Sequence, residues 1–257
     1  MEIFIISFTA FITAILTFFS GFGLGTILAP VLMIFFPVEL AIALTGVVHF
    51  FNNIFKLFLV GKYANKNVLL SFGIPAVLAA IPGAWLLLQL SDLQAFYTYE
   101  MFGKTFEVSP IKLVIAILLI IFALMDLLPR FKNMQFDRNK LLLGGLLSGF
   151  FGGLSGNQGA LRSAFLIKAG LSKEAFVGTA VVVSTFVDFT RLSVYATRLL
   201  HVGLYDNLNI ILFATLSAVA GAYLGNQLLK KVTLQFVQIT VAIMLLFLAI
   251  AIGSGLL

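Results

Sequence analysis

A lone arginine within a long apolar stretch is the residue of this chain that most clearly suggests chemistry. Arg162 ends the segment GFFGGLSGNQGALR (149–162) and follows Gln158 by four residues. A guanidinium, two side-chain amides and the free backbone N–H groups at the start of a short helix are all donors that suit an oxyanion. The segment therefore predicts an anion-binding site made of Gly156, Asn157, Gln158, Gly159 and Arg162. The alternative is that the glycines only allow close helix packing and that Arg162 pairs with a buried acid.

Two further apolar segments carry stripes of polar residues. In 41–60 the spacing is i, i+3, i+4 and i+7, and the stripe consists of His49, Asn52, Asn53 and Lys56. In 175–198 a matching stripe consists of Ser184, Thr185, Asp188 and Arg191, of which 184, 188 and 191 share one helix face. Two stripes at corresponding places predict a polar cavity that binds the same substrate.

Each stripe has a structural alternative. Lys56 lies about one turn from Gly61 and has the length to reach the cytoplasmic surface. Asp188 and Arg191, at i and i+3, have the spacing of a structural pair. Alternatively, Asp188 pairs with Arg162 or accepts a proton during transport. His49 is either a hydrogen-bonded structural group or a site of proton coupling, because an imidazole titrates near neutral pH.

The balance of buried charge points to the class of substrate. Asp188 is the only carboxylate deep in an apolar segment, whereas Arg162, Arg191 and Lys56 are basic. An excess of positive charge favours an anionic substrate over a cation. We expect neither an enzyme nor a metal site, since no nucleophile–base pair is apparent, the chain has no cysteine, and its two histidines lie far apart. We also expect no cofactor and no nucleic-acid partner.

The composition indicates a protein of the lipid bilayer. Of the 257 residues, 61% are hydrophobic and 10% are charged, against about 25% charged in soluble domains. Long apolar runs predict an all-α integral membrane protein. The apolar segments are 3–20, 24–36, 41–60, 68–90, 111–129, 141–151, 157–169, 175–198, 206–229 and 233–256.

Three of these segments, 24–36, 141–151 and 157–169, are too short to cross a bilayer alone. If 3–36 and 141–169 are re-entrant hairpins, three loop cations fall on one side (Lys104, Lys112 and Arg198) and ten on the other (Lys62, Lys66, Arg130, Lys132, Arg138, Lys140, Lys168, Lys173, Lys230 and Lys231). This asymmetry predicts a multi-pass protein of the cell (inner) membrane with both termini outside and basic loops, such as RFKNMQFDRNK (130–140), in the cytoplasm. The segment 91–109 is expected to link helices at the outer interface.

The chain also repeats itself. GFGLGTILAP (21–30) is similar to GGLSGNQGAL (152–161), and ELAIALTGVV (39–48) is similar to EAFVGTAVVV (174–183). Each half, 1–130 and 131–257, would hold one hairpin followed by three transmembrane helices. Because three crossings are odd, the halves form an inverted-topology repeat. The hairpin tips near Gly25 and Gly156 would meet at the midplane, which adds Gly25 and Thr26 to the predicted site.

The glycine-rich first tip, the second tip GGLSGNQGALR, the run EAFVGTAVVVSTFVD and the closing AGAYLG together resemble the TauE/SafE family of sulfite exporters. This resemblance implies a transporter of small sulfur-containing anions, such as sulfoacetate, related organosulfonates or sulfite. By position it implies a substrate region at Gly23, Gly25, Gly156 and Gly159, together with Asn157, Gln158 and Arg162. We therefore expect alternating access around a midplane site. An anion channel, or a carrier of another organic anion such as a carboxylate, is the alternative.

Overall fold

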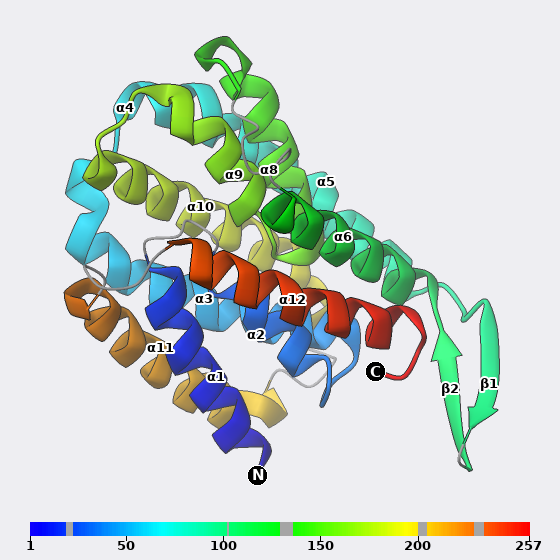
Figure 1. The fold of residues 1–257 in the computed structure, drawn as a ribbon. Helices are drawn as coiled ribbons and strands as arrows, with labels where there is room; N and C mark the ends of the chain where they lie inside the picture. The colour runs from blue at the N-terminus through cyan, green and yellow to red at the C-terminus, as the bar shows by residue number, and fades with distance from the viewer. Residues whose placement is uncertain (19–22, 102, 129–135, 200–204, 229–233) are drawn as a thin grey trace.

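The protein is a bundle of helices with a β-hairpin projecting from one end (Figure 1). The fold is that of a computed structural model, which describes residues 1–18, 23–101, 103–128, 136–199, 205–228 and 234–257. The helices of the first half are α1 (Glu2–Thr17), α2 (Gly25–Leu32), α3 (Val38–Val60), α4 (Lys66–Val68), α5 (Ile74–Ser91) and α6 (Pro110–Leu127). Those of the second half are α8 (Leu141–Ser155), α9 (Gly159–Leu166), α10 (Lys173–Leu199), α11 (Leu208–Leu228) and α12 (Leu234–Gly253).

The helices match the apolar segments predicted from the sequence. Four of them, counted over the described residues, are long and apolar enough to cross a membrane: 38–63, 66–91, 173–196 and 208–227. The second of these combines α4 and α5 through a π-helical turn at Leu69–Gly73. Large apolar side chains project outward along the bundle, including those of Phe4, Phe58, Leu70, Trp85 and Phe247. The chain is therefore an all-α membrane protein, since lipid can cover such a surface and water cannot.

The segment 91–109 differs from the expected linker. It forms an antiparallel hairpin of β1 (Tyr97–Met101) and β2 (Lys104–Val108). The turn uses Gly103 at φ +72°, a conformation that glycine adopts without strain. Tyr99 stacks on Phe106, and its hydroxyl donates to the carbonyl of Ser254 at 2.7 Å. These contacts fix the hairpin to the end of α12.

One end of the bundle collects the loops that the sequence predicts to be cytoplasmic. The backbone N–H of Phe136 donates to the carbonyl of Ala164 (3.3 Å), which joins the start of α8 to the end of α9. The backbone N–H of Asn65 donates to the hydroxyl of Thr179 (2.9 Å), which joins the start of α4 to α10. A shared hydrophobic cluster links both pairs. The described cations near this end are Lys62, Lys66, Arg138, Lys140, Lys168 and Lys173.

The opposite end holds the β-hairpin and fewer cations. Arg198 at the end of α10 donates to the carbonyl of Leu88 (2.9 Å) and pairs with Asp92 after α5. The described cations near this end are Lys104, Lys112 and Arg198. The other basic residues of the predicted cytoplasmic loops, Arg130, Lys132, Lys230 and Lys231, lie outside the described residues.

Both short helices turn back on the helix that precedes them. Near the start of α8, a Cβ added to Gly144 would collide with the ring of Phe165 near the end of α9. Near the tip, the hydroxyl of Ser148 donates to the carbonyl of Gln158 at 3.4 Å. Helices α8 and α9 are therefore antiparallel. Figure 1 shows α2 returning in the same way beside α1, which it contacts.

Each hairpin packs mainly on a helix of the other half. The first helix, α1, lies against α11, and α8 lies against α5. Two more contacts cross between the halves, α3 with α10 and α6 with α12 (Figure 1). The two halves therefore build one body, because neither hairpin has its main partner within its own half.

Glycines make the contact between α8 and α5 close. Gly145, Gly149 and Gly153 repeat every four residues, and a Cβ on any of them would collide with a backbone carbonyl of α5 or of the turn before it. Gly221 brings α11 similarly close to the backbone of α1, and Gly225 lies one turn further along the same contact. Small residues at this spacing allow helices to approach in lipid. The packing interpretation of the glycines is thus correct for the body of α8, up to the tip at Gly156.

Candidate anion-binding site

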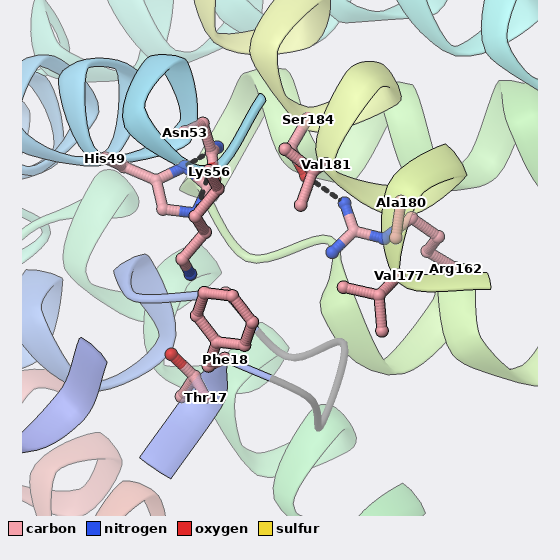
Figure 2. Close-up of a pocket in the computed structure, with 11 residues that line it drawn as sticks. Thr17, Phe18, His49, Asn53, Lys56, Arg162, Val177, Ala180, Val181 and Ser184 are labelled. Carbon is pink, nitrogen blue, oxygen red and sulfur yellow. Dashed lines mark hydrogen bonds between the residues drawn. The ribbon is translucent and has the colours of Figure 1, made fainter. Parts of the chain in front are cut away.

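A small polar cavity lies where the two hairpins meet α3 and α10. Figure 2 shows the side chains of Arg162 and Lys56 directed toward it from different helices. Its lining consists of Thr17, Phe18, Gly23, His49, Asn53, Lys56, Arg162, Val177, Ala180, Val181 and Ser184. The volume open to the centre of a water molecule is about 20 Å³, enough for about one water. The cavity is therefore small in this conformation.

Arg162 is held in place by its hydrogen bond to α10. It begins the second turn of α9, where its side chain is only 3% exposed. Its Nη1 donates to the hydroxyl of Ser184 (Figure 2). This bond fixes the guanidinium of Arg162 at the wall of the cavity.

Lys56 is the second cation of the cavity. It is 4% exposed, and its Nζ lies 5.2 Å from the centre of the Phe18 ring. The alternative that Lys56 reaches the cytoplasmic surface is wrong. Side chains on a helix lean toward its N-terminus, which directs Lys56 away from the end of α3 at Val60 and into the protein. The aromatic face stabilises the ammonium by a cation–π contact.

His49 connects the cavity to a buried network of charges. Its Nδ1 lies 2.6 Å from Oδ2 of Asp188, and Asn53 Nδ2 donates to the same oxygen at 3.0 Å. The other ring nitrogen faces the first hairpin, because a Cβ added to Gly23 would lie 3.0 Å from Nε2. Gly23 has a φ of +85°, so both its conformation and its space favour glycine. The imidazole therefore bridges Asp188 and the cavity.

Arg191 completes this network on the side away from the cavity. Its Nε and Nη2 lie 3.0 and 2.8 Å from Oδ1 of Asp188, and both side chains are fully buried. The pair predicted from the i, i+3 spacing is thus present. The carboxylate of Asp188 is shared between His49, Asn53 and Arg191.

The two hairpin tips meet directly beside this network. A Cβ added to Gly25 would lie 3.1 Å from the carbonyl oxygen of Gly156. The hydroxyl of Thr26 donates to Oδ1 of Asn157 at 3.2 Å, across 131 residues of sequence. Gly156 ends α8 at φ +73°, and a Cβ there would collide with Nη1 of Arg191. We call Gly25, Thr26, Thr45, Gly156, Asn157 and Arg191 the tip junction.

The structure brings only some of the predicted residues to the cavity wall. The predicted residues that line the cavity include Arg162, His49, Asn53 and Lys56. Those that belong to the tip junction are Gly25, Thr26, Gly156, Asn157 and Arg191. Asp188 lies between the cavity and the tip junction. The remaining predicted residues are buried at other places. Thr185 donates to the carbonyl of Val181 within α10, Gln158 packs on Gly152, Gly159 begins α9, and Asn52 lies on α3.

Five lining residues were not indicated by the sequence: Thr17, Phe18, Val177, Ala180 and Val181. Gly23 and Ser184 also line the cavity and were indicated, because the resemblance included Gly23 and the stripe of 175–198 included Ser184. The five are ordinary residues of membrane helices. Their role depends on the way the hairpins fold back, which their types and spacing do not reveal.

A second cavity lies on the other side of α10 and differs in kind. It has a volume of about 310 Å³ and lies between α10 and the region of the π-helical turn before α5. Its lining is apolar and includes Leu70, Ile74, Leu78 and Phe186, all of which are more than half exposed. It has no group that recognises an anion. Among the described residues, no three histidine, aspartate or glutamate side chains gather as a metal site would require.

Comparisons with known proteins identify the family. A family model described as "Sulfite exporter TauE/SafE" matches residues 6–252, nearly the whole chain. No curated protein and no solved structure matched. The matched region contains both hairpins, the tip junction and the whole cavity lining, so the expectation drawn from the sequence motifs is confirmed. The chain belongs to the TauE/SafE sulfite exporter family of membrane transporters.

Proposed function

We propose that this protein carries small sulfur-containing oxyanions across the membrane by alternating access, with the cavity at Arg162 and Lys56 as the binding site. The observation that carries the proposal is the pairing of two buried cations with a hydroxyl in one small cavity. A cation deep in a membrane helix costs about 2.5–3.5 kcal/mol on insertion scales. Two such residues lining one cavity therefore support an anionic substrate.

The geometry of the donors suits a sulfite or sulfonate group. Such a group has three oxygens, which match a guanidinium, an ammonium and the Ser184 hydroxyl. Phe18, Val177, Ala180 and Val181 supply apolar walls beside these donors. The small volume of the cavity favours sulfite or a short sulfonate over a bulky anion in this conformation. An anion must therefore widen the cavity on entry, as a carrier allows.

The fold supports alternating access between two inverted repeats, 1–130 and 131–257. Each hairpin packs on a helix of the other half, and α3 crosses α10 beside the cavity. Re-entrant hairpins place helix starts at the level of the substrate, and a rocking of one half against the other then changes the side from which it is reached. In this proposal both termini are outside and the basic end is cytoplasmic.

Exchange in proteoliposomes tests the transport activity. We expect saturable exchange of labelled sulfite, inhibited by short sulfonates and weakly by acetate. An Arg198→Gln variant is the matched control, because it removes an arginine of α10 outside the cavity and should transport normally. Continuous anion current through single molecules would indicate a channel instead. Equal preference for acetate would indicate a carboxylate carrier, and no anion flux at all would refute the proposal.

Single cysteines test the topology, because the chain has none of its own. A cysteine at Thr98 in β1 should react with an impermeant reagent from outside intact cells. A cysteine at Lys66, at the start of α4, should react only after permeabilisation. Labelling of both positions from the same side would refute the proposed arrangement of hairpins and crossings.

Coupling to protons through His49 belongs to the same proposal. Nε2 of His49 faces the cavity while Nδ1 contacts Asp188. The charged groups around the ring are Asp188 and Arg191 of α10, Lys56 of its own helix and Arg162 of α9. An anion in the cavity favours a protonated ring, and by linkage a protonated ring favours the anion. His49→Gln should still bind methanesulfonate, which does not titrate near neutral pH, with a lower affinity than the protonated wild type. It should lose the accompanying proton flux recorded by an internal dye. Proton flux that survives in His49→Gln would refute this role.

A further inference from the structure

The tip junction contains buried polar atoms that have no hydrogen-bond partner. These are Nη1 of Arg191, Nδ2 of Asn157 and the hydroxyl of Thr45, and their side chains are 0%, 3% and 0% exposed. All three lie around the contact of the two tips. Nη1 of Arg191 lies against Gly156, and Oδ1 of Asn157 accepts a hydrogen bond from Thr26. Cγ2 of Thr45 would lie 3.5 Å from a Cβ added to Gly25.

Packing does not explain these atoms. Buried polar groups in native proteins nearly always have partners, and an unpartnered group is costly. Elsewhere in the chain the buried hydroxyls of Thr179 and Ser148 have partners, because Thr179 accepts from the N–H of Asn65 and Ser148 donates to Gln158. Those of Ser7, Ser163 and Thr215 have none, but they do not meet at one place as the atoms of the tip junction do. Three side chains with unpartnered atoms therefore meet where the start of α2 contacts the turn between α8 and α9.

The arrangement has the chemistry of an oxyanion site that is closed. All three groups donate hydrogen bonds, and one is a guanidinium that also contacts Asp188 and Tyr195. Backbone N–H groups at the starts of α2 and α9 lie nearby, and each helix has eight residues. The gap itself is shut, because the carbonyl of Gly156 would lie within 3.1 Å of a Cβ on Gly25.

We propose that the tip junction is a second station for the transported oxyanion, entered from the cavity when the two hairpin tips separate. This proposal rests on the proposed transport function and adds a second binding position to it. The anion leaves Arg162 and Lys56, passes His49 and Asp188, and is held by Arg191, Asn157 and Thr45. The station and the cavity are open in different states of the transport cycle. While the station is closed, as in this structure, Arg191 pairs with Asp188, which lies between the station and the cavity.

Two conservative variants test the station without disturbing the cavity. Thr45→Val removes the unpartnered hydroxyl at nearly constant shape. Arg191→Lys keeps a positive charge for Asp188 and removes the free guanidinium donor. We expect both variants to bind methanesulfonate with an affinity within about twofold of the wild type, because binding occurs in the cavity. Their exchange rates should be lower by about tenfold or more, because each variant loses one hydrogen bond to a charged anion.

Thermal unfolding of the anion-free protein in detergent separates this role from a structural one. Thr45→Val should unfold at the same or a higher temperature than the wild type, because it removes an unsatisfied group. The matched control is Thr179→Val, which removes an equally buried hydroxyl that has a partner. It should unfold at a lower temperature and exchange methanesulfonate normally once folded.

A disulfide lock tests the separation of the tips directly. The chain has no cysteine, and Thr26 and Asn157 contact each other, so Thr26→Cys with Asn157→Cys gives one defined pair. The oxidised pair should bind methanesulfonate but not exchange it, and reduction should restore exchange to the level of the reduced protein before oxidation.

Normal exchange in both Thr45→Val and Arg191→Lys would overturn the station, and so would undiminished exchange in the oxidised pair. If the two variants bound methanesulfonate more weakly in proportion to their slower exchange, the junction would be part of a single site, which would also overturn the station. Absence of methanesulfonate binding and exchange in the wild type would instead refute the proposed function, and the station with it.

Discussion

Two buried arginines of this protein, Arg162 on α9 and Arg191 on α10, are equally hidden from the surface but have different surroundings. Arg191 has two nitrogens within 3.0 Å of the same carboxylate oxygen of Asp188. Arg162 donates to the hydroxyl of Ser184 and lines a cavity with Lys56. Burial alone therefore does not distinguish a structural cation from a binding one. The two differ in their partners, a carboxylate for Arg191 and a hydroxyl for Arg162, and the proposed function gives Arg162 the binding role.

The strongest test of this comparison removes the carboxylate. Asp188→Ala leaves Arg191 and His49 without their shared partner, and we expect a loss of about 3–5 kcal/mol in the free energy of unfolding. Unfolding in detergent, followed by circular dichroism, measures it. Asp137→Ala is the control, since Asp137 is exposed and lies 3.8 Å from Lys168, a pair worth about 0–1 kcal/mol. Equal stability of the two variants would show that Arg191 does not depend on Asp188.

The matching test removes the cavity arginine. Arg162→Ala should weaken sulfite binding about a hundredfold or more, because hydrogen bonds from a charged donor contribute about 1.5–3 kcal/mol each. The protein should still fold, because the substitution leaves the neutral hydroxyl of Ser184, whereas Asp188→Ala leaves the charged guanidinium of Arg191 without its carboxylate. Calorimetry in detergent measures the affinity. An unchanged affinity would contradict the assignment of the cavity.

A smaller effect is expected at Lys56. Lys56→Met keeps the length of the side chain and its contact with Phe18 but removes the ammonium. Sulfite binding should weaken about tenfold, while the unfolding temperature should rise because a buried charge is lost. A fall in both quantities would make Lys56 a structural residue.

The smallest effect is expected at Ser184, which positions Arg162. Ser184→Ala should weaken binding about three- to tenfold, as for one neutral hydrogen bond of about 0.5–1.5 kcal/mol. Ser193→Ala is the control on the same helix, where an exposed hydroxyl donates to the carbonyl of Phe189. Equal affinities in the two variants would mean that Arg162 keeps its orientation without Ser184.

The sequence was sufficient to predict the helices and the main cations of the site. Polar residues in apolar segments are rare, so Arg162, His49, Asn53 and Lys56 were recognisable individually. The predicted pair of Asp188 and Arg191 followed from helix geometry alone. The contact of His49 with Asp188 did not, because it joins residues 139 positions apart and depends on the crossing of α3 with α10.

The missed elements have physical reasons as well. The strands of the β-hairpin show alternation, with Tyr97 and Tyr99 on one face, but their aromatic residues also suit a membrane interface. Thr17, Phe18 and the small residues of α10 line the cavity only because the hairpins fold back. No pattern within a helix distinguishes a residue that faces such a cavity from one that faces a neighbouring helix.

The packing of each hairpin on the opposite half has a consequence for biosynthesis. Helix α1 (residues 2–17) rests on α11 (residues 208–228), which is made almost 200 residues later. At about 5–20 residues per second of synthesis, the first hairpin waits roughly 10–40 seconds in or beside the bilayer before its partner emerges. During that time the N–H groups at the start of α2 lack the protein that later surrounds them. The first hairpin can therefore reach its final packing only after α11 has been made.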